Sequence, residues 1–290
     1  MRALRGCSAV GAGRGRHAVT SDPSAVQAAS APGRRRRTTA WRRRLGLLRS
    51  LLIYYGVPFK IRRLAELYRP FVKRGDLCFD VGAHVGDRTL ALRRLGARVV
   101  AVEPQPICVG WLRWRYGGDP GITIVDAGVA EAEGAKTMFV SEQNPTVSSL
   151  SPAWVESVRT APRFAGVRWD DEIPVPVTTL DTLITRFGSP ALCKLDVEGS
   201  EAAALAGLSR AIPTVIFESI PAQRSATRAC LTRLEALGSY EYNRTEREVP
   251  RLRHVEWMAA EAMAAIVDAL PDSAHSGDIF ARLRRAAGSG

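Results

Sequence analysis

The sequence predicts an α/β fold whose central sheet is doubly wound and mostly parallel, with an antiparallel pair of strands at one edge. From residue 77 onward, short apolar runs typical of buried parallel strands alternate with helical segments. Such sheets bind ligands at the carboxyl ends of their strands, and five expected strands end on an acid: Asp80, Glu103, Asp126, Asp196 and Glu218. For each acid taken singly, capping of the following helix is the alternative interpretation. The 290 residues, 46% of them hydrophobic, suffice for one large domain with an extension.

The first strand–turn–helix–strand unit spans residues 77–103. We expect a buried strand over 77–81, a turn containing Gly82 and Gly86, and a helix over 87–95. The two glycines permit a tight turn and a close approach of the backbone to a ligand. Glu103 follows the next strand, 21 residues after Gly82, where a doubly wound sheet places the carboxylate that binds a ribose. The unit therefore predicts a site for a nucleoside-bearing cofactor.

The later elements continue the alternation. We expect helices over 107–116, 181–187, 201–208 and 227–237, and strands over 122–125, 137–140, 175–177, 191–195, 214–217, 240–242 and 278–281. Right-handed crossovers through the helices make most strands parallel. The last two strands lack a clear helical spacer, which suggests that they form the antiparallel edge pair.

The charge of the chain divides it into a tail and a domain. The formal net charge is +12, but residues 1–44 hold 11 arginines and one acid, so the rest of the chain carries only +2. We expect residues 1–44 to be a disordered extension, 45–285 a single domain with a helical lead-in over 45–75, and 286–290 a flexible tail. The nearly neutral domain gives no indication of a nucleic-acid groove, so we expect no nucleic-acid partner.

The basic tail and the apolar segment 45–57 leave one alternative open. A solvated extension is the simplest interpretation of the arginines, and contact with anionic lipid or nucleic acid is the alternative. Residues 45–57 are too few to cross a bilayer and lack a signal-peptide cleavage site. We expect them to form a helix that packs on the domain, with a basic amphipathic surface helix as the alternative. No transmembrane segment is therefore expected, and weak peripheral membrane contact is the most that this region predicts.

The five cysteines have no paired spacing. Cys78 and Cys193 lie in apolar strands and are expected to be buried thiols, which indicates a reducing compartment and a cytoplasmic location. The histidines and cysteines show no metal-ligand spacing, so no metal is expected, although a carboxylate-bound ion is left open.

The turn after the first strand favours one cofactor over another. A dinucleotide-binding turn reads G-x-G-x-x-G, whereas this turn reads G-x-x-x-G with His84 at the second glycine position. Asp80 precedes it, and an anion there would repel a pyrophosphate. The same anion suits the amino group and sulfonium of S-adenosylmethionine. An NAD(P)-dependent oxidoreductase is the alternative.

Six short motifs occur in a specific order: Asp80-Val-Gly-Ala83, Glu103-Pro104, Gly128-Val-Ala-Glu131, Val147-Ser-Ser-Leu150, Thr179-Leu-Asp181 and Lys194-Leu-Asp-Val-Glu-Gly-Ser-Glu201. In this combination the chain resembles the FkbM-type methyltransferases over about residues 50–285. The resemblance implies a class I methyltransferase fold with a Rossmann-like sheet and S-adenosylmethionine as donor. It also implies a small-molecule or glycan hydroxyl as acceptor, on a sugar, glycolipid or secondary metabolite. His84 departs from the asparagine usual in the family.

These motifs give a set of candidate site residues. For cofactor binding we expect Asp80, Gly82, Ala83, His84, Gly86, Thr89, Glu103, Pro104, Asp126, Gly128 and Asp196. A hydroxyl acceptor loses its proton on methylation, and the candidate bases are Asp196 first, Glu198 second and His84 third. The alternative role for Asp196 and Glu198 is to bind the cofactor or to cap the following helix. The alternative for His84 is that it only occupies a position in the turn and has no chemical role. Ser148, Ser149 and Glu218 are expected to bind the acceptor, and Asp181 to fix a helix start. A nucleic-acid-associated methyltransferase that uses the Arg-rich tail is a further alternative.

Overall fold

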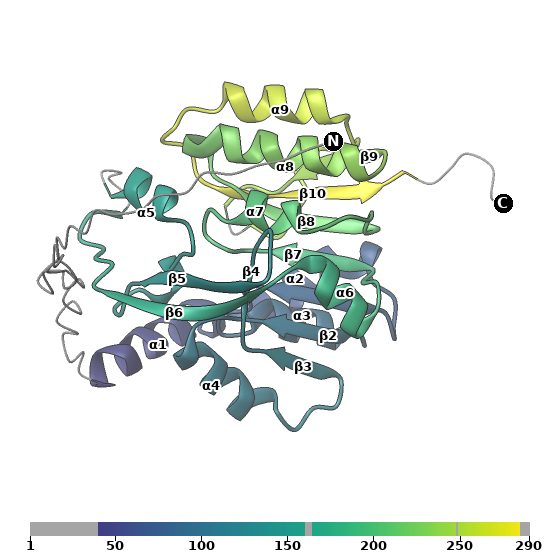
Figure 1. Ribbon diagram of the computed structural model, residues 1–290. Helices are drawn as coiled ribbons and strands as arrows, with labels where there is room; N and C mark the ends of the chain where they lie inside the picture. Colours follow the sequence, from purple (N-terminus) through teal and green to yellow (C-terminus); the bar gives the residue numbers. More distant parts are fainter. Residues whose placement is uncertain (1–39, 160–163, 248, 285–290) are drawn as a thin grey trace, which may run out of the picture. The chain divides into compact units, whose positions relative to one another are not determined.

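The structure is a computed structural model that describes residues 40–159, 164–247 and 249–284. Its main sheet has seven strands in the order β3-β2-β1-β7-β8-β10-β9 (Figure 1). The strands are β3 (Ile122–Val125), β2 (Arg98–Val102), β1 (Leu77–Val81), β7 (Leu192–Leu195), β8 (Thr214–Ser219), β10 (Gly277–Leu283) and β9 (Tyr240–Arg244). The first five are mutually parallel, whereas β10 pairs antiparallel with both β8 and β9. The expected antiparallel edge pair is confirmed.

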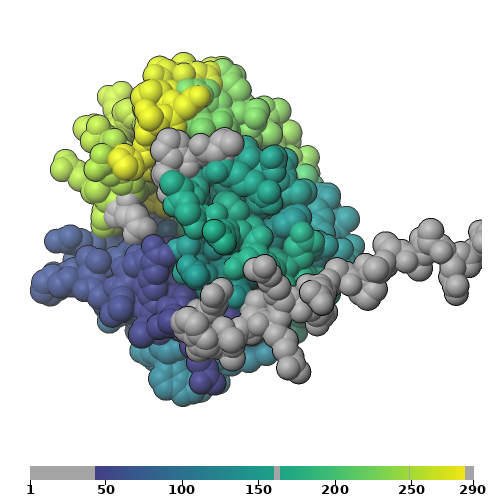
Figure 2. Space-filling view, turned by 90° about the vertical axis from the view of Figure 1, so that its left-hand side faces the viewer, coloured from purple at the N-terminus to yellow at the C-terminus, as the bar shows by residue number. Residues whose placement is uncertain are grey.

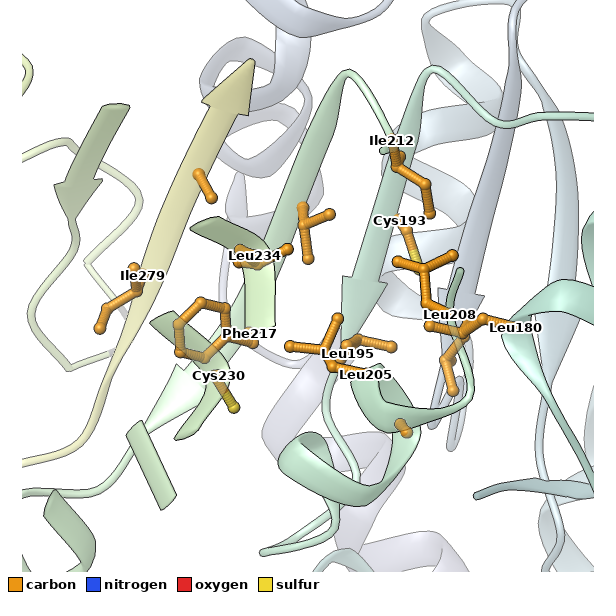
Figure 3. Close-up of a cluster of buried hydrophobic side chains, with 14 of the residues drawn as sticks. Leu180, Cys193, Leu195, Leu205, Leu208, Ile212, Phe217, Cys230, Leu234 and Ile279 are labelled. Carbon is orange, nitrogen blue, oxygen red and sulfur yellow. The ribbon is translucent and has the colours of Figure 1, made fainter. Parts of the chain in front are cut away.

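Helices cover both faces of this sheet, and each face has its own hydrophobic core. On one face, α6 (Leu180–Phe187), α7 (Glu201–Ala206), α8 (Arg224–Leu237) and α9 (Ala260–Ala269) pack on β7, β8 and β10. Figure 3 shows this core, where Phe217 and Leu195 of the strands meet Cys230 and Leu234 of α8 and Leu205 of α7. On the other face lie α2 (Lys60–Tyr68), α3 (Asp87–Arg94) and α4 (Pro106–Tyr116).

The central strand β1 shows how the sequence produces this arrangement. All five of its residues are buried, because a parallel strand in the middle of a doubly wound sheet has helices on both sides. Successive side chains point to opposite faces, so Phe79 and Val81 join the α6–α9 core while Cys78 joins the core under α2 and α3. Asp80 shares the face of Cys78 and therefore points toward α3. Cys78 and Cys193 are buried free thiols, as expected.

Three features differ from the sequence-based expectations. Helix α9 lies between β9 and β10, where no clear helix is expected; it is almost wholly apolar and so shows little helical alternation. A second sheet of order β4-β6-β5 joins β4 (Gly128–Val129), β6 (Asp171–Thr178) and β5 (Gly134–Val140). Thr179, not Asp181, caps α6 by accepting from the Thr182 N–H, and Asp181 instead accepts from the Ser209 N–H at 2.9 Å.

The helical lead-in begins earlier than expected. Helix α1 (Ala40–Tyr55) includes residues 40–44, which the charge pattern assigns to a disordered extension. Arg43 explains the difference, because its guanidinium donates to Glu142 at 3.0 Å and to Asp171 at 2.6 Å and so ties α1 to the second sheet. The expectations for residues 1–39 and 286–290 fall outside the described residues. Within the part that is described, no helix is long and apolar enough to cross a membrane.

Candidate active site

A cavity of ≈ 640 Å³, part of it open to solvent, lies at the carboxyl ends of β1, β2 and β7. This is the edge at which a doubly wound sheet binds its ligands. Eight of the residues expected from the sequence line the cavity: Gly82, His84, Glu103, Pro104, Gly128, Ser148, Asp196 and Glu198. These eight residues come from five separate stretches of the chain and meet around one space.

The floor of the cavity is the turn after β1. Gly82 has φ +79°, and a Cβ added there would lie 1.8 Å from the Asp196 carbonyl oxygen, so no side chain fits between β1 and β7. The N–H groups of Gly82 and Ala83 donate to the Val102 carbonyl at 2.9 and 3.0 Å. These bonds fix the turn against the end of β2. Ala83 itself is buried behind the turn.

Glu103 is held at the end of β2 by the backbone around it. One carboxylate oxygen accepts from the His84 N–H at 2.8 Å, and the other accepts from the Gln105 N–H at 2.7 Å. The residue is only 3% exposed, and this burial raises the pKa of Glu103 to about 7 although the two backbone hydrogen bonds oppose the shift. The carboxylate can therefore change its protonation state close to neutral pH.

His84 turns into the cavity beside α1. Its φ of 48° places it in the left-handed region, and its ring meets the Tyr54 ring edge-on at 5.3 Å between centroids. Burial lowers the pKa of His84 to about 4, so the imidazole is neutral at pH 7. The Nε2 atom is buried and has no hydrogen-bond partner among the described residues.

Asp196 lies between two positive side chains. Arg88 approaches its carboxylate at 3.0 Å and Lys194 at 3.7 Å. Burial alone would raise the pKa of Asp196, but the charges of Lys194 and Arg88 outweigh burial and hold it below its usual value. The carboxylate is therefore ionised and a weak proton acceptor, which disfavours its first place among the candidate bases.

Glu218, on the neighbouring strand β8, has the opposite electrostatics. Burial, reinforced by the negative charges of Asp196 and Glu201, raises the pKa of Glu218 to about 8. One oxygen each of Glu218, Asp196 and Glu198 lie within 4.8 Å of one another. Three carboxylates at such distances could attract a cation, but Lys194 and Arg88 already supply positive charge next to Asp196.

Some expected cofactor-binding residues support the turn from outside the cavity. Asp80 points away from it and accepts from the Thr89 hydroxyl at 2.5 Å, and both side chains are fully buried. Gly86 caps α3 and packs on α4, where an added Cβ would lie 2.7 Å from the Tyr116 ring. The sequence pattern locates these residues on the unit correctly but does not show which way they face.

Two further expected residues also lie away from the cavity wall. Asp126 is exposed and pairs with Arg113 at 3.3 Å, so its carboxylate faces solvent. Ser149 is buried and donates its hydroxyl to the Glu198 carbonyl at 2.6 Å, which fixes the loop that carries Glu198.

Several residues that line or support the cavity were not among those expected from the sequence. Tyr54, Arg88, Gln105 and Met138 line it, and Lys194 lies behind it. Lys194 could have been recognised from the sequence, because a charged residue in a buried strand needs partners of opposite charge. The two-residue period of a strand places its side chain on the same side as that of Asp196. For Tyr54 and Met138, which come from α1 and the second sheet, the sequence offers no local signal.

A family assignment follows from comparison with known proteins. Residues 80–240, more than half of the chain, match the family described as the methyltransferase FkbM domain. The chain belongs to this family. The resemblance drawn from the motifs is confirmed, and the seven-stranded sheet is that of a class I methyltransferase. Membership implies S-adenosylmethionine as methyl donor and favours it over NAD(P). No curated protein matches the sequence.

Solved structures of methyltransferases are similar to this FkbM protein at low identity. A TehB-like S-adenosylmethionine-dependent methyltransferase from Corynebacterium glutamicum is 12% identical, with 85% of this chain and 100% of that chain covered and a TM-score of 0.44. An O-methyltransferase from Bacillus cereus in complex with S-adenosylhomocysteine is 11% identical, with 82% and 90% covered and a TM-score of 0.40.

The residues of the cavity fit an S-adenosylmethionine molecule. Two buried polar atoms on its wall, His84 Nε2 and Gln105 Oε1, have no partner in the described part of the chain, and a polar ligand would satisfy them. The carboxylates of Glu103 and Asp196 offer acceptors for hydroxyl and amino groups. Gly82 allows the end of β1 to lie directly against the Asp196 carbonyl at the floor of the cavity.

Proposed function

We propose that this FkbM methyltransferase transfers a methyl group from S-adenosylmethionine to a hydroxyl oxygen of a sugar, glycolipid or secondary metabolite. The observation that carries the proposal is a second cavity that meets the first. Asp196, Glu198, Tyr54 and Arg88 line both cavities. The residues that line only the second include Glu218, Thr245, Arg247, His275, Ser276 and Asp278, which are polar or charged. Such a wall suits an acceptor with several hydroxyl groups.

In this proposal the first cavity binds the cofactor. Glu103 accepts hydrogen bonds from the ribose hydroxyls, while Gly82 and His84 lie along the methionine part. Asp196, kept ionised by Lys194 and Arg88, can accept hydrogen bonds from the amino group of the cofactor. When bound, the cofactor supplies an activated methyl group, so the protein mainly has to align the acceptor oxygen with it.

The proton of the acceptor hydroxyl needs a base, and we propose Glu218 for this role in place of Asp196. Once ionised, a carboxylate with a pKa of about 8 is a stronger proton acceptor than one whose pKa is held below its usual value, and Glu218 is mostly ionised only above about pH 8. Glu218 also lies in the wall of the second cavity, on the acceptor side. Glu198, which lines both cavities, is the second candidate.

Calorimetry with S-adenosylmethionine, S-adenosylhomocysteine and NAD tests the cofactor assignment. We expect the two adenosyl compounds to bind and NAD not to, and Glu103→Ala to weaken adenosyl binding at least about tenfold by removing two acceptors. Glu131→Ala is the matched control, because Glu131 is exposed and pairs only with Lys136 among its described contacts. Binding of NAD instead, by a folded protein, would refute the assignment.

Transfer of a labelled methyl group to a panel of monosaccharides, glycolipids, hydroxylated natural products and RNA tests the acceptor class. We expect product with a hydroxylated small molecule, and Glu218→Gln to lower kcat while leaving S-adenosylmethionine binding unchanged. Methylation of RNA alone, lost when residues 1–39 are deleted, would favour the nucleic-acid alternative.

A further inference from the structure

The surface of α1 and the turn that follows it is unusually apolar. Nine large hydrophobic side chains of the described residues are exposed, and six of them lie between residues 45 and 59: Leu45, Leu48, Leu52, Ile53, Val57 and Phe59. Leu52 and Phe59 are 65% and 69% exposed. Single exposed hydrophobic residues are common, but a contiguous group indicates a surface that contacts something else.

The apolar residues occupy the outer face of α1. Gly46 and Ser50 are buried on the inner face, where Gly46 packs so closely on the Glu142 carbonyl that an added Cβ would lie 2.3 Å from it. The exposed positions follow helical spacing and comprise Arg44, Leu45, Leu48, Arg49, Leu52 and Ile53. A helix that only packs on a domain shows the reverse pattern, with its polar side outward. Figure 2 shows the dark purple residues of this region on the molecular surface beside teal residues from the middle of the chain.

The turn between α1 and α2 extends the same surface. Phe59 has φ 62°, in the left-handed region that is unfavourable for residues with a Cβ, and its ring faces solvent. Neither core packing nor a hydrogen-bonded cap accounts for a phenylalanine here. An exposed aromatic ring at a helix turn suits insertion between lipid headgroups.

The charges around the surface identify its partner. Arg44 and Arg49 lie on the exposed face of α1, Arg63 is exposed on α2 next to Arg62, which pairs with Glu66, and residues 1–44 carry a net charge of +10. We propose that α1 and the α1–α2 turn dock on an anionic lipid bilayer, with the leucines and Phe59 buried at the headgroup boundary and the arginines against lipid phosphates. Aliphatic side chains gain nothing from the phosphates of a nucleic acid, and a second copy of the chain would bring the same positive charges together.

The docking surface adjoins the second cavity. The second cavity is lined in part by Tyr54 of α1 and by Lys60, Leu64 and Leu67 of α2. Docking would therefore place this wall of the cavity at the bilayer surface. Provided that the proposed function holds, the acceptor is then a hydroxyl on an amphiphilic, membrane-resident molecule. Docking itself is independent of the reaction and is tested without turnover.

The test is cosedimentation of the full chain with phosphatidylcholine vesicles, with and without phosphatidylglycerol. We expect binding only to the anionic vesicles, weakened by salt, and reduced about tenfold or more in the triple variant Leu48→Gln/Leu52→Gln/Phe59→Gln. The control is Trp114→Gln/Val255→Gln, which removes two exposed hydrophobic side chains elsewhere and should bind like the wild type. An unchanged melting temperature shows that each variant is folded.

Two other outcomes would overturn the proposal. Equal vesicle binding by the wild type and the triple variant would assign binding to the arginines of residues 1–44 alone. Absence of vesicle binding, together with a wild-type dimer that the triple variant converts to a monomer in sedimentation velocity, would make this surface an interface between two copies of the chain.

Discussion

Replacing Lys194 by methionine tests whether a buried ion pair organises the end of the central sheet. Lys194 is fully buried in β7, and its ammonium donates to the Leu195 carbonyl and to Asp278 on β10, both at 3.0 Å. It also lies 3.7 Å from Asp196. Methionine keeps the length and apolar character of the chain but removes all three interactions, which isolates the contribution of the charge.

The size of the effect follows from these distances. Two unit charges 3.0 Å apart interact by about 5 kcal/mol at an effective dielectric constant of about 20, and desolvation of the lysine offsets much of this. Removing one partner of a buried pair costs about 3–5 kcal/mol because the other charge is left uncompensated. Asp278 retains 20% exposure and Asp196 retains Arg88, so we expect a loss near the lower limit, about 3 kcal/mol.

Urea unfolding of the wild type and Lys194→Met measures the difference, with Lys136→Met as control. Lys136 pairs with Glu131 on the surface, where about 1 kcal/mol or less is expected. The pKa of Lys194 is raised and that of Asp196 is lowered in the folded protein. The stabilisation from Lys194 is therefore present below its unfolded pKa of about 10.5 and lost as pH rises through the folded value. That from Asp196 is present above about pH 4 and lost as pH falls. Equal losses in the two variants, or a loss at Lys194 that does not shrink in acid, would refute the reasoning.

Three further outcomes are expected. Gly82→Ala should abolish S-adenosylmethionine binding in calorimetry, since the added Cβ would lie 1.8 Å from the Asp196 carbonyl and displace the turn; retained affinity would contradict this. Because the pKa of Glu103 is raised to about 7 and its ionised form is the better hydrogen-bond acceptor, S-adenosylmethionine affinity should fall by up to about tenfold per pH unit below 7 and level off above it. Glu103→Gln should remove that dependence, and a profile unchanged in the variant would assign it to another group. Phe217→Ala should lower the free energy of unfolding by about 3–5 kcal/mol in urea titrations, because the fully buried ring fills the core between β8 and α8, and a loss under about 1 kcal/mol would show that the core closes around the gap.

The parallel part of the sheet could be predicted because its strands are short apolar runs followed by acids. Each side of β1 is covered by helices, so Leu77–Val81 is apolar except at Asp80, and its short length and the glycine turn that follows indicate a buried strand. Helix α9 was not predicted because Ala260–Ala269 is apolar on nearly all sides, so its sequence shows little alternation between apolar and polar residues. Strands were expected within β5 and β6, but their pairing in a separate sheet was not. The prolines of β6 are typical of edge strands and turns, and its pairing with β5 joins residues 31 to 43 apart.

The position of a residue along the chain predicted which parts of the site come together, but not the direction of every side chain. Glu103 and Asp196 follow their strands and reach the cavity as expected. Asp80 is still within β1, where the two-residue period turns it toward Thr89 and α3. Glu103 and Asp196 each come one residue after their strands, whereas Asp80 precedes the last residue of β1. This difference of two positions separates residues that line the cavity from one that supports the turn.

Protonation is the property that the sequence could not supply, because it depends on neighbours from other strands and helices. Asp196 and Glu218 both occupy the carboxyl ends of adjacent parallel strands, and their sequence patterns do not distinguish a base from a binding group. In space, Asp196 faces Lys194 and Arg88, whereas Glu218 faces Asp196 and Glu201. The same kind of side chain thus has a lowered pKa in one place and a pKa of about 8 in the other. Two carboxylates whose environments separate their pKa values in this way can have different roles. Asp196 remains ionised and pairs with positive charge, whereas Glu218 is the one suited to accept a proton.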